Sequence, residues 1–371
     1  MQRGCLLLLF LSIVVISLFG CASLDLKVTE ERAVLVEGTG GYSRPISTHS
    51  DLSQKFFDQG LRLTWGYYFP ESVASYQEAL RHDPDHPMIY WGLALALGPN
   101  PNSRYARLID DPQGEARNAI NRARKFIKNA NDKERALVDA LYVRFDTDTY
   151  ETRDTRDRAY FEAVRNLYQQ YPEDPDVVTL FADAYMVMTP WVYWDEEGRP
   201  LMGTAEVGQA LETVMELHPD HPGANHLYIH LMEAGANPER ALVQAYRLEA
   251  LMPIAGHVVH MPSHIYVRLG QYDKAIASNE RSAAADARFL EAWGGAFFST
   301  YWYILYVCSE PHQACLRFHP LCCCDSGQLR NCHCSGTHGF EVGTRRQHTT
   351  WPRTKTGGDR VAGSQDVRPV G

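Results

Sequence analysis

Cysteine is missing from most of this chain. None of the nine cysteines lies between Cys21 and Cys308, and seven of them follow that gap. A long stretch without thiols is expected of a protein that works where stray thiols would oxidise. The chain also lacks an excess of positive charge, since its net charge is −9, and nucleic acid is therefore not an expected partner.

Several catalytic motifs are missing as well. The sequence contains no Gly-x-Ser-x-Gly, no His-Glu-x-x-His and no glycine-rich phosphate loop. These patterns are typical of serine hydrolases, zinc peptidases and nucleotide-binding proteins respectively. What remains is a chain of 371 residues, 45% hydrophobic and 22% charged, the composition of an ordinary folded protein. No enzyme class is predicted.

An apolar run occupies residues 5–19, directly after Arg3. A short positive segment followed by about 15 apolar residues is typical of a secretory signal, and such a run is at the short end for spanning a bilayer of roughly 30 Å. The tetrad LFGC that closes the run at Cys21 resembles the bacterial lipobox. The resemblance implies that residues 1–20 are removed and that lipidated Cys21 anchors the protein to the cell membrane or outer membrane, on the periplasmic, extracytoplasmic face. An ordinary signal peptide with a cysteine near the cut is the alternative.

Residues 21–50 are predicted to form an irregular tether, because glycines and Pro45 interrupt any periodic pattern. Amphipathic segments follow over residues 51–307 and end repeatedly at a similar phrase: DPDHP, YPEDP and HPDHP, closing at Pro87, Pro175 and Pro222. Such prolines end one helix and preset φ for the next. The helices expected between these points span residues 87–97, 115–129, 132–146, 155–171, 175–188 and 204–217.

Residues 224–251 align without gaps with residues 258–285, at an offset of 34. The matched pairs are His226 with His260, His230 with His264, and Ala241 with Ala275. An interval of 34 residues is the period of the tetratricopeptide repeat, one helix-turn-helix hairpin per repeat. The pattern predicts an all-α, right-handed superhelical solenoid of about six TPR-like (tetratricopeptide-like) hairpins over residues 51–307.

Longer stretches extend this similarity. They are QGLRLTWGYYFPESVASYQEALRHDPDHPMIYWGLALALGPN at residues 59–100, HPGANHLYIHLMEA, and GHVVHMPSHIYVRLGQYDKAI. Together they resemble a family of exported bacterial tetratricopeptide proteins over roughly residues 50–307. That family carries no assigned activity, so the resemblance implies the fold and little chemistry.

The periodic pattern stops at Cys308. Residues 308–371 are rich in Cys, His, Arg and Gly and contain no apolar stripe of helical length. We interpret them as a frameshifted or otherwise non-native end. A disordered, disulfide-forming tail is one alternative and a metal knuckle is another. Its ligands would be Cys322, Cys323, Cys324, Cys332, Cys334 and His338, although three consecutive cysteines suit a tetrahedral zinc ion poorly.

Six side chains able to bind a metal recur at helical spacing in the matched repeats. They are His226, His230, Glu233, His257, His260 and His264. Residues three, four and seven apart share one helix face, and neighbouring helices pack at about 8–10 Å, so the set could enclose Zn or Cu. The alternative is that these histidines hydrogen-bond between repeats or line a peptide groove. Pro262 leaves the shared face of His257 and His260 in doubt, because it starts or kinks a helix.

Three aromatic residues, Trp191, Tyr193 and Trp194, lie in an insertion relative to the repeat period. They are candidates for stacking on a sugar or peptide, or for plugging the insertion onto the helical surface. The leading expectation is a membrane-anchored scaffold that binds a protein or peptide ligand. The alternative is a metal-binding protein, or an enzyme, that uses the histidines.

Overall fold

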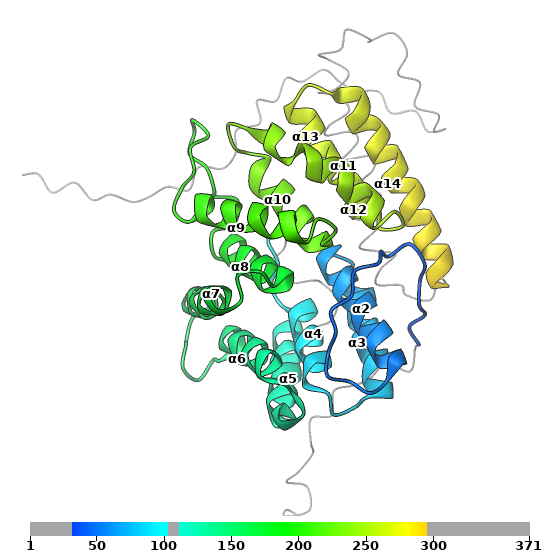
Figure 1. The fold of residues 1–371 in the computed structure, drawn as a ribbon, viewed down its shortest axis with the longest axis vertical. Coiled ribbons are helices and arrows are strands. Elements are labelled where there is room, and N and C mark those ends of the chain that lie inside the picture. The colour runs from blue at the N-terminus through cyan, green and yellow to red at the C-terminus, as the bar shows by residue number, and fades with distance from the viewer. Residues whose placement is uncertain (1–31, 103–110, 295–371) are drawn as a thin grey trace, which may run out of the picture. The chain divides into compact units, whose positions relative to one another are not determined.

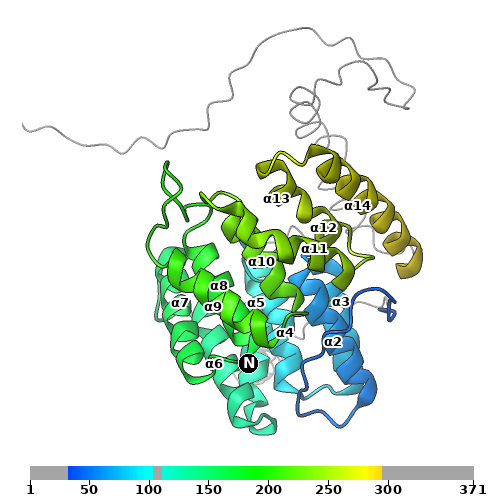
Figure 2. The ribbon, with the colours of Figure 1, turned by 45° about the horizontal axis from the view of Figure 1, so that its top comes forward.

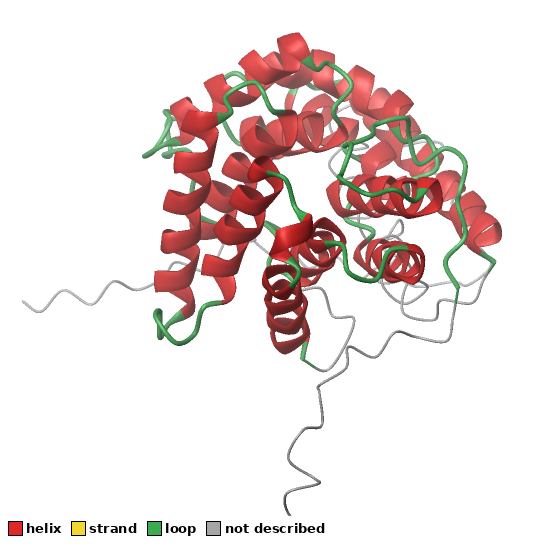
Figure 3. Cartoon of the chain, turned by 60° about the horizontal axis from the view of Figure 1, so that its bottom comes forward, coloured by secondary structure: helices red, strands yellow, loops and turns green. Residues whose placement is uncertain are grey.

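The computed structural model describes residues 32–102 and 111–294. These residues form helices joined by loops and turns, as Figure 3 shows, and they contain no β-strand. An isolated antiparallel bridge pairs Trp194 with Pro200. The predicted all-α class is confirmed for this part of the chain. Residues 1–20, Cys21 and residues 308–371 lie outside the described residues.

The helices follow one another along the chain, and the insertion at residues 189–203 separates α8 from α9 (Figure 1). In chain order they are α2 (Asp51–Trp65), α3 (Phe69–His82), α4 (Pro87–Leu97), α5 (Pro112–Lys125), η1 (Ile127–Asn129), α6 (Asp132–Phe145), α7 (Arg153–Gln170), α8 (Pro175–Met188), α9 (Thr204–Leu217), α10 (Pro222–Met232), η2 (Pro238–Ala241), α11 (Leu242–Leu251), α12 (Gly256–His260), α13 (Pro262–Arg268) and α14 (Tyr272–Trp293). The bounds expected for α4 and for α6 to α9 agree to within two residues. The expected 115–129 covers α5, which begins three residues earlier, and the short helix η1.

The repeated proline phrase starts three helices, as predicted. Pro87, Pro175 and Pro222 each occupy the first helical position, where the missing N–H is not needed. The residue before each proline caps the helix with its side chain. His86 accepts from the N–H of Met88, Asp174 from those of Asp176 and Val177, and His221 from that of Ala224.

Each helix packs against the next, and α10 also contacts α8 and α2 (Figures 1 and 2). Every residue of α4 and of α10 is buried. Close approach depends on small residues here, since the ring of Tyr76 lies against Gly60 of α2 and Gly92 of α4. The contact between α10 and α2 brings residues near position 65 beside residues near position 226.

The described part of the predicted tether, residues 32–50, is irregular but held against the helices. The backbone N–H of Val36 donates to Gln59 at 2.7 Å. The Arg44 guanidinium donates to Asp174 and to Asp176, each at 2.9 Å, and all three side chains are buried. This segment therefore joins α2 to the start of α8.

None of the helices within residues 32–102 and 111–294 combines the length and the apolar composition that crossing a bilayer requires.

Candidate metal centre

The six metal-binding candidates come together in space. Helix α10 carries His226 and His230 and is capped by Glu233, whereas the later residues lie on α12 and α13. Pro262 does divide the second set: α12 ends at His260 and α13 begins at Pro262. The rings of His260 and His264 nevertheless lie only 4.8 Å apart, so the division leaves this pair intact.

Three of the histidines form the core of the cluster. One ligand nitrogen each from His226, His230 and His257 lies within 4.8 Å of the other two. Nε2 of His226 and Nε2 of His257 are 3.1 Å apart. An ion bound tetrahedrally at about 2.0–2.1 Å would separate neighbouring nitrogens by about 3.3 Å. The spacing of this pair is therefore already close to that of two ligands on one ion.

Acceptor oxygens hold the outer nitrogens of two of these rings, those of His226 and His230. Nδ1 of His226 donates to the carbonyl of Trp65 at 2.6 Å, and Nδ1 of His230 donates to Glu233 at 2.9 Å. Because a carbonyl or a carboxylate can only accept, the proton of each neutral ring sits on Nδ1 and the lone pair on Nε2. Oxygen partners of this kind orient histidines in metal sites. Nε2 of His230 is buried and has no hydrogen-bond partner, so it is free to bind an ion.

The other half of the cluster repeats the arrangement. Nδ1 of His264 donates to Glu233 at 2.5 Å, and Nδ1 of His260 donates to Asn279 at 2.5 Å. Nε2 of His260 and Nε2 of His264 then face each other at 3.0 Å. Glu233 contacts one histidine of each half.

Burial keeps most of these imidazoles neutral. Burial and the neighbouring His230 hold the pKa of His226 well below its usual value, and burial and His226 do the same to the pKa of His257. Burial lowers the pKa of His230 although Glu233 opposes the shift. Burial and His264 lower the pKa of His260 to about 3. Neutral imidazole is the form that binds a metal.

Glu233 and His264 behave as an ion pair. Burial would raise the pKa of Glu233, but His264 and His230 hold the pKa of this carboxyl well below its ordinary range. Burial would lower the pKa of His264, but the Glu233 carboxylate raises it above its usual value. The imidazolium of His264 balances the negative charge of Glu233, and a cation that displaced its proton would be stabilised by the same carboxylate.

Two strained aromatic residues border the cluster. Among the described residues, Tyr67 and Trp191 are the non-glycine residues with positive φ, 63° and 62°. The Tyr67 ring lies 4.5 Å from that of His226 and 5.2 Å from that of His257, and the Trp191 ring lies 5.6 Å from that of His230. Backbone strain of this kind is typical of functional sites.

The three aromatic candidates of the insertion have different surroundings. Tyr193 is buried and donates to the carbonyl of Met186, and Trp194 donates to the carbonyl of Leu231 at 2.6 Å. These two fix the insertion onto the helices. Trp191 is 50% exposed. The insertion and the histidines thus meet at one place, where the Trp191 ring lies against that of His230.

Three residues that contact the histidine cluster were not recognised from the sequence: Trp65, Tyr67 and Asn279. Trp65 contributes a main-chain carbonyl, for which no residue pattern exists. Tyr67 precedes α3 and reaches the cluster because α10 packs on α2, far away in sequence. Asn279 lies on α14, packed against α12, so its spacing from His260 could have suggested a contact between the two helices of one repeat.

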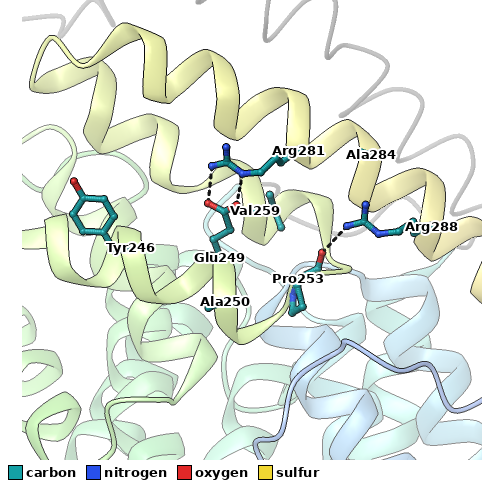
Figure 4. Close-up of a pocket in the computed structure, with 8 residues that line it drawn as sticks. All are labelled: Tyr246, Glu249, Ala250, Pro253, Val259, Arg281, Ala284 and Arg288. Atoms are coloured by element: carbon teal, nitrogen blue, oxygen red, sulfur yellow. Dashed lines mark hydrogen bonds and ion pairs between the residues drawn. The ribbon is translucent and has the colours of Figure 1, made fainter.

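A separate hollow of about 420 Å³ lies between α11 and α14 (Figure 4). Its charged groups already have protein partners: Arg281 donates twice to Glu249, and Arg288 donates to the carbonyl of Pro253. The histidine cluster, in contrast, contains a nitrogen without a partner, and it is the stronger candidate site.

In comparisons with known proteins, no family model and no curated protein matches this sequence. The tetratricopeptide family and the lipobox therefore stay predictions.

Proposed function

We propose that this protein binds a transition-metal ion of the zinc or copper class through His226, His230 and His257. The observation that carries the proposal is the convergence of three ligand nitrogens within 4.8 Å. The hydrogen bonds that Nδ1 of His226 and of His230 donate support it further, because they leave Nε2 of both rings ready to bind. Three histidines leave one position of a tetrahedral ion for water or another ligand.

The proposal includes the architecture and the location predicted above. The metal centre belongs to a right-handed superhelical array of TPR-like hairpins, and Cys21 anchors the array by a lipid on the exported side of a bacterial membrane. The packing of successive helices supports the array. The LFGC tetrad supports the anchor.

Metal analysis of the full-length protein tests the proposal. Its cysteines are first alkylated, which leaves residues 22–307 unmodified because they contain none. The protein is stripped with a chelator, loaded with Zn²⁺, desalted and analysed by mass spectrometry. We expect His230→Ala and His257→Ala each to bind at least one zinc ion fewer than the wild type, whereas His218→Ala, at an exposed position of the loop before α10, binds the same number.

Circular dichroism of each variant shows whether it is folded. If His230→Ala is unfolded, His257→Ala supplies the comparison, since His257 is only partly buried. Equal zinc content in the wild type and in a folded variant would refute the proposal.

A second candidate function is the binding of a protein or peptide partner. It is supported by the exposed apolar side chains of the insertion: Trp191, Val192 and Met202 are 50%, 59% and 84% exposed. Exposed apolar groups of this kind mark interaction sites. A partner that co-purifies with the wild type and with His230→Ala, but not with a Val192→Asp, Met202→Asp double variant, would support it. A partner retained by the double variant would refute the use of this surface.

A further inference from the structure

A second pair of ligands lies beside the three-histidine core. Nε2 of His260 and Nε2 of His264 are 3.0 Å apart, and their rings are inclined at 76°. Within the part of the chain that the structure describes, the core is the group in which three or more potential ligands lie within 4.8 Å of one another. The pair is therefore adjacent to the core but distinct from it.

The hydrogen bonds of this pair leave an electrostatic problem. Glu233 accepts from Nδ1 of His264, and Asn279 accepts from Nδ1 of His260. With both rings neutral, each would direct an Nε2 lone pair at the other, and two lone pairs at this distance repel. A positive charge between them would hold the arrangement. In the metal-free protein, the Nε2 proton of the His264 imidazolium that pairs with Glu233 supplies this charge, and a metal ion can take the place of that proton.

We infer that a second transition-metal ion binds between Nε2 of His260 and Nε2 of His264, so that the cluster is a two-ion centre. The inference rests on the proposed function. The spacing of 3.0 Å is near the separation of about 3.3 Å expected for two nitrogens on one tetrahedral ion. The pair also has the same outer support as His226 and His230, with each Nδ1 donating to an oxygen, which is the usual arrangement of metal-bound histidines.

The two halves adjoin closely enough to act as one centre. The rings of His230 and His264 lie 5.4 Å apart. Glu233 accepts from both through different oxygens. A single carboxylate thus orients one ligand of each proposed ion and supplies negative charge to both.

Calorimetric titration of the alkylated, full-length apoprotein with Zn²⁺ tests the inference, with the bound zinc counted after gel filtration. We expect the wild type to bind two ions that depend on the cluster. His260→Ala and His264→Gln should each lose one and keep the ion of the core. His257→Ala should lose the core ion, and His218→Ala should lose none. Circular dichroism again identifies any variant that has not folded, and the two variants of the pair serve as substitutes for each other.

The outcomes separate this inference from the proposed function. If one ion binds, disappears in His257→Ala and persists in folded His260→Ala and His264→Gln, the pair holds only a proton, and the second ion is refuted while the core site stands. If no bound zinc depends on any of these residues, both proposals fail. Two ions retained by His260→Ala would also refute the second site.

Discussion

The carboxylate of Glu233 accepts a hydrogen bond from Nδ1 of His264 over 2.5 Å, although 31 positions separate the two residues. Its other oxygen accepts from His230. Glu233→Gln keeps the size of the side chain but replaces one acceptor oxygen by an NH₂ donor, so one of the two imidazoles loses its support.

We expect Glu233→Gln to lower the apparent zinc affinity about 10–100-fold, with the number of ions bound at saturation unchanged. Competition against a chromophoric chelator measures the affinity. Glu216→Gln, at an exposed position of α9, is the control. An affinity equal to that of the wild type would mean that Glu233 does not orient the ligands.

Trp191 offers a spectroscopic test of where the metal binds. Its ring lies 5.6 Å from that of His230 and nearly perpendicular to it. Because Cu²⁺ quenches nearby indole fluorescence, we expect Cu²⁺ to quench a component of the wild-type emission that Trp191→Phe lacks. Trp91→Phe, which removes an indole that donates to Leu137 on α6, should keep that component. Equal quenching in the wild type and in Trp191→Phe would argue against an ion at His230.

The sequence predicted the helices and the gathering of the histidines because both depend on local periodicity. The offset of 34 residues predicts equivalent positions for His226 and His260 in neighbouring repeats, and in the structure α10 contacts α13. The proline phrases mark three helix starts for a similar reason: proline at the first helical position costs no hydrogen bond.

The remaining features depend on contacts between distant parts of the chain. Nδ1 of His226 bonds to Trp65, 161 positions earlier, because α10 packs on α2. A repeat period of 34 residues does not predict a hydrogen bond between two positions so far apart in the sequence. The burial of His226 and His230 has the same origin, since Tyr67, between α2 and α3, lies against both rings.

Arg44 links the N-terminal segment to α8. Burial would raise the pKa of Asp176, but Arg44 and His221 hold the pKa of this carboxyl far below its usual value, and Arg44 likewise keeps the pKa of Asp174 low. Arg44→Gln leaves two buried carboxylates without this partner. We expect it to reduce the free energy of unfolding at pH 7 by about 3–5 kcal/mol. Arg135→Gln, which removes an exposed ion pair with Asp132, should cost about 0–1 kcal/mol.

The effect of Arg44→Gln depends on pH with a definite sign. Both aspartates have folded pKa values below the unfolded value of about 3.9, so their contribution is present above pH 4 and is lost as the pH falls below it. The difference in the free energy of unfolding between the wild type and Arg44→Gln, measured by urea denaturation, should therefore become smaller from pH 7 to pH 3. A constant difference would contradict a role for the ion pairs.

The contribution of Glu71 to the free energy of unfolding should depend on pH in the opposite direction. Burial raises the pKa of Glu71 to about 8, opposed by a hydrogen bond to the backbone and assisted by the nearby Asp286 carboxylate. The folded value exceeds the unfolded value of about 4.3, so the contribution of Glu71 to stability is full below pH 4 and is lost as the pH rises through 8. Glu71→Gln does not titrate.

We expect the free energy of unfolding of Glu71→Gln to rise relative to that of the wild type between pH 5 and pH 9. Denaturation by urea at the two pH values measures it. Glu173→Gln, at an exposed position, should follow the wild type. A parallel response of Glu71→Gln and the wild type would show that Glu71 titrates at its ordinary pKa.

The packing of α2, α3 and α4 depends on Gly92. A Cβ atom at this position would lie 2.3 Å from a ring carbon of Tyr76, and one at Gly60 would lie 2.8 Å from the same ring. Held between two helices, the ring has little room to move. We expect Gly92→Ala to reduce the free energy of unfolding by about 1–3 kcal/mol through overpacking.

Gly208→Ala is the matched control, because the nearest atom to its Cβ is on Leu231 at 3.7 Å. Alanine favours a helix over glycine by about 0.5–1 kcal/mol, so Gly208→Ala should stabilise the protein. Chemical denaturation of the two variants measures both effects, and equal stabilities would mean that the Tyr76 ring moves aside without cost.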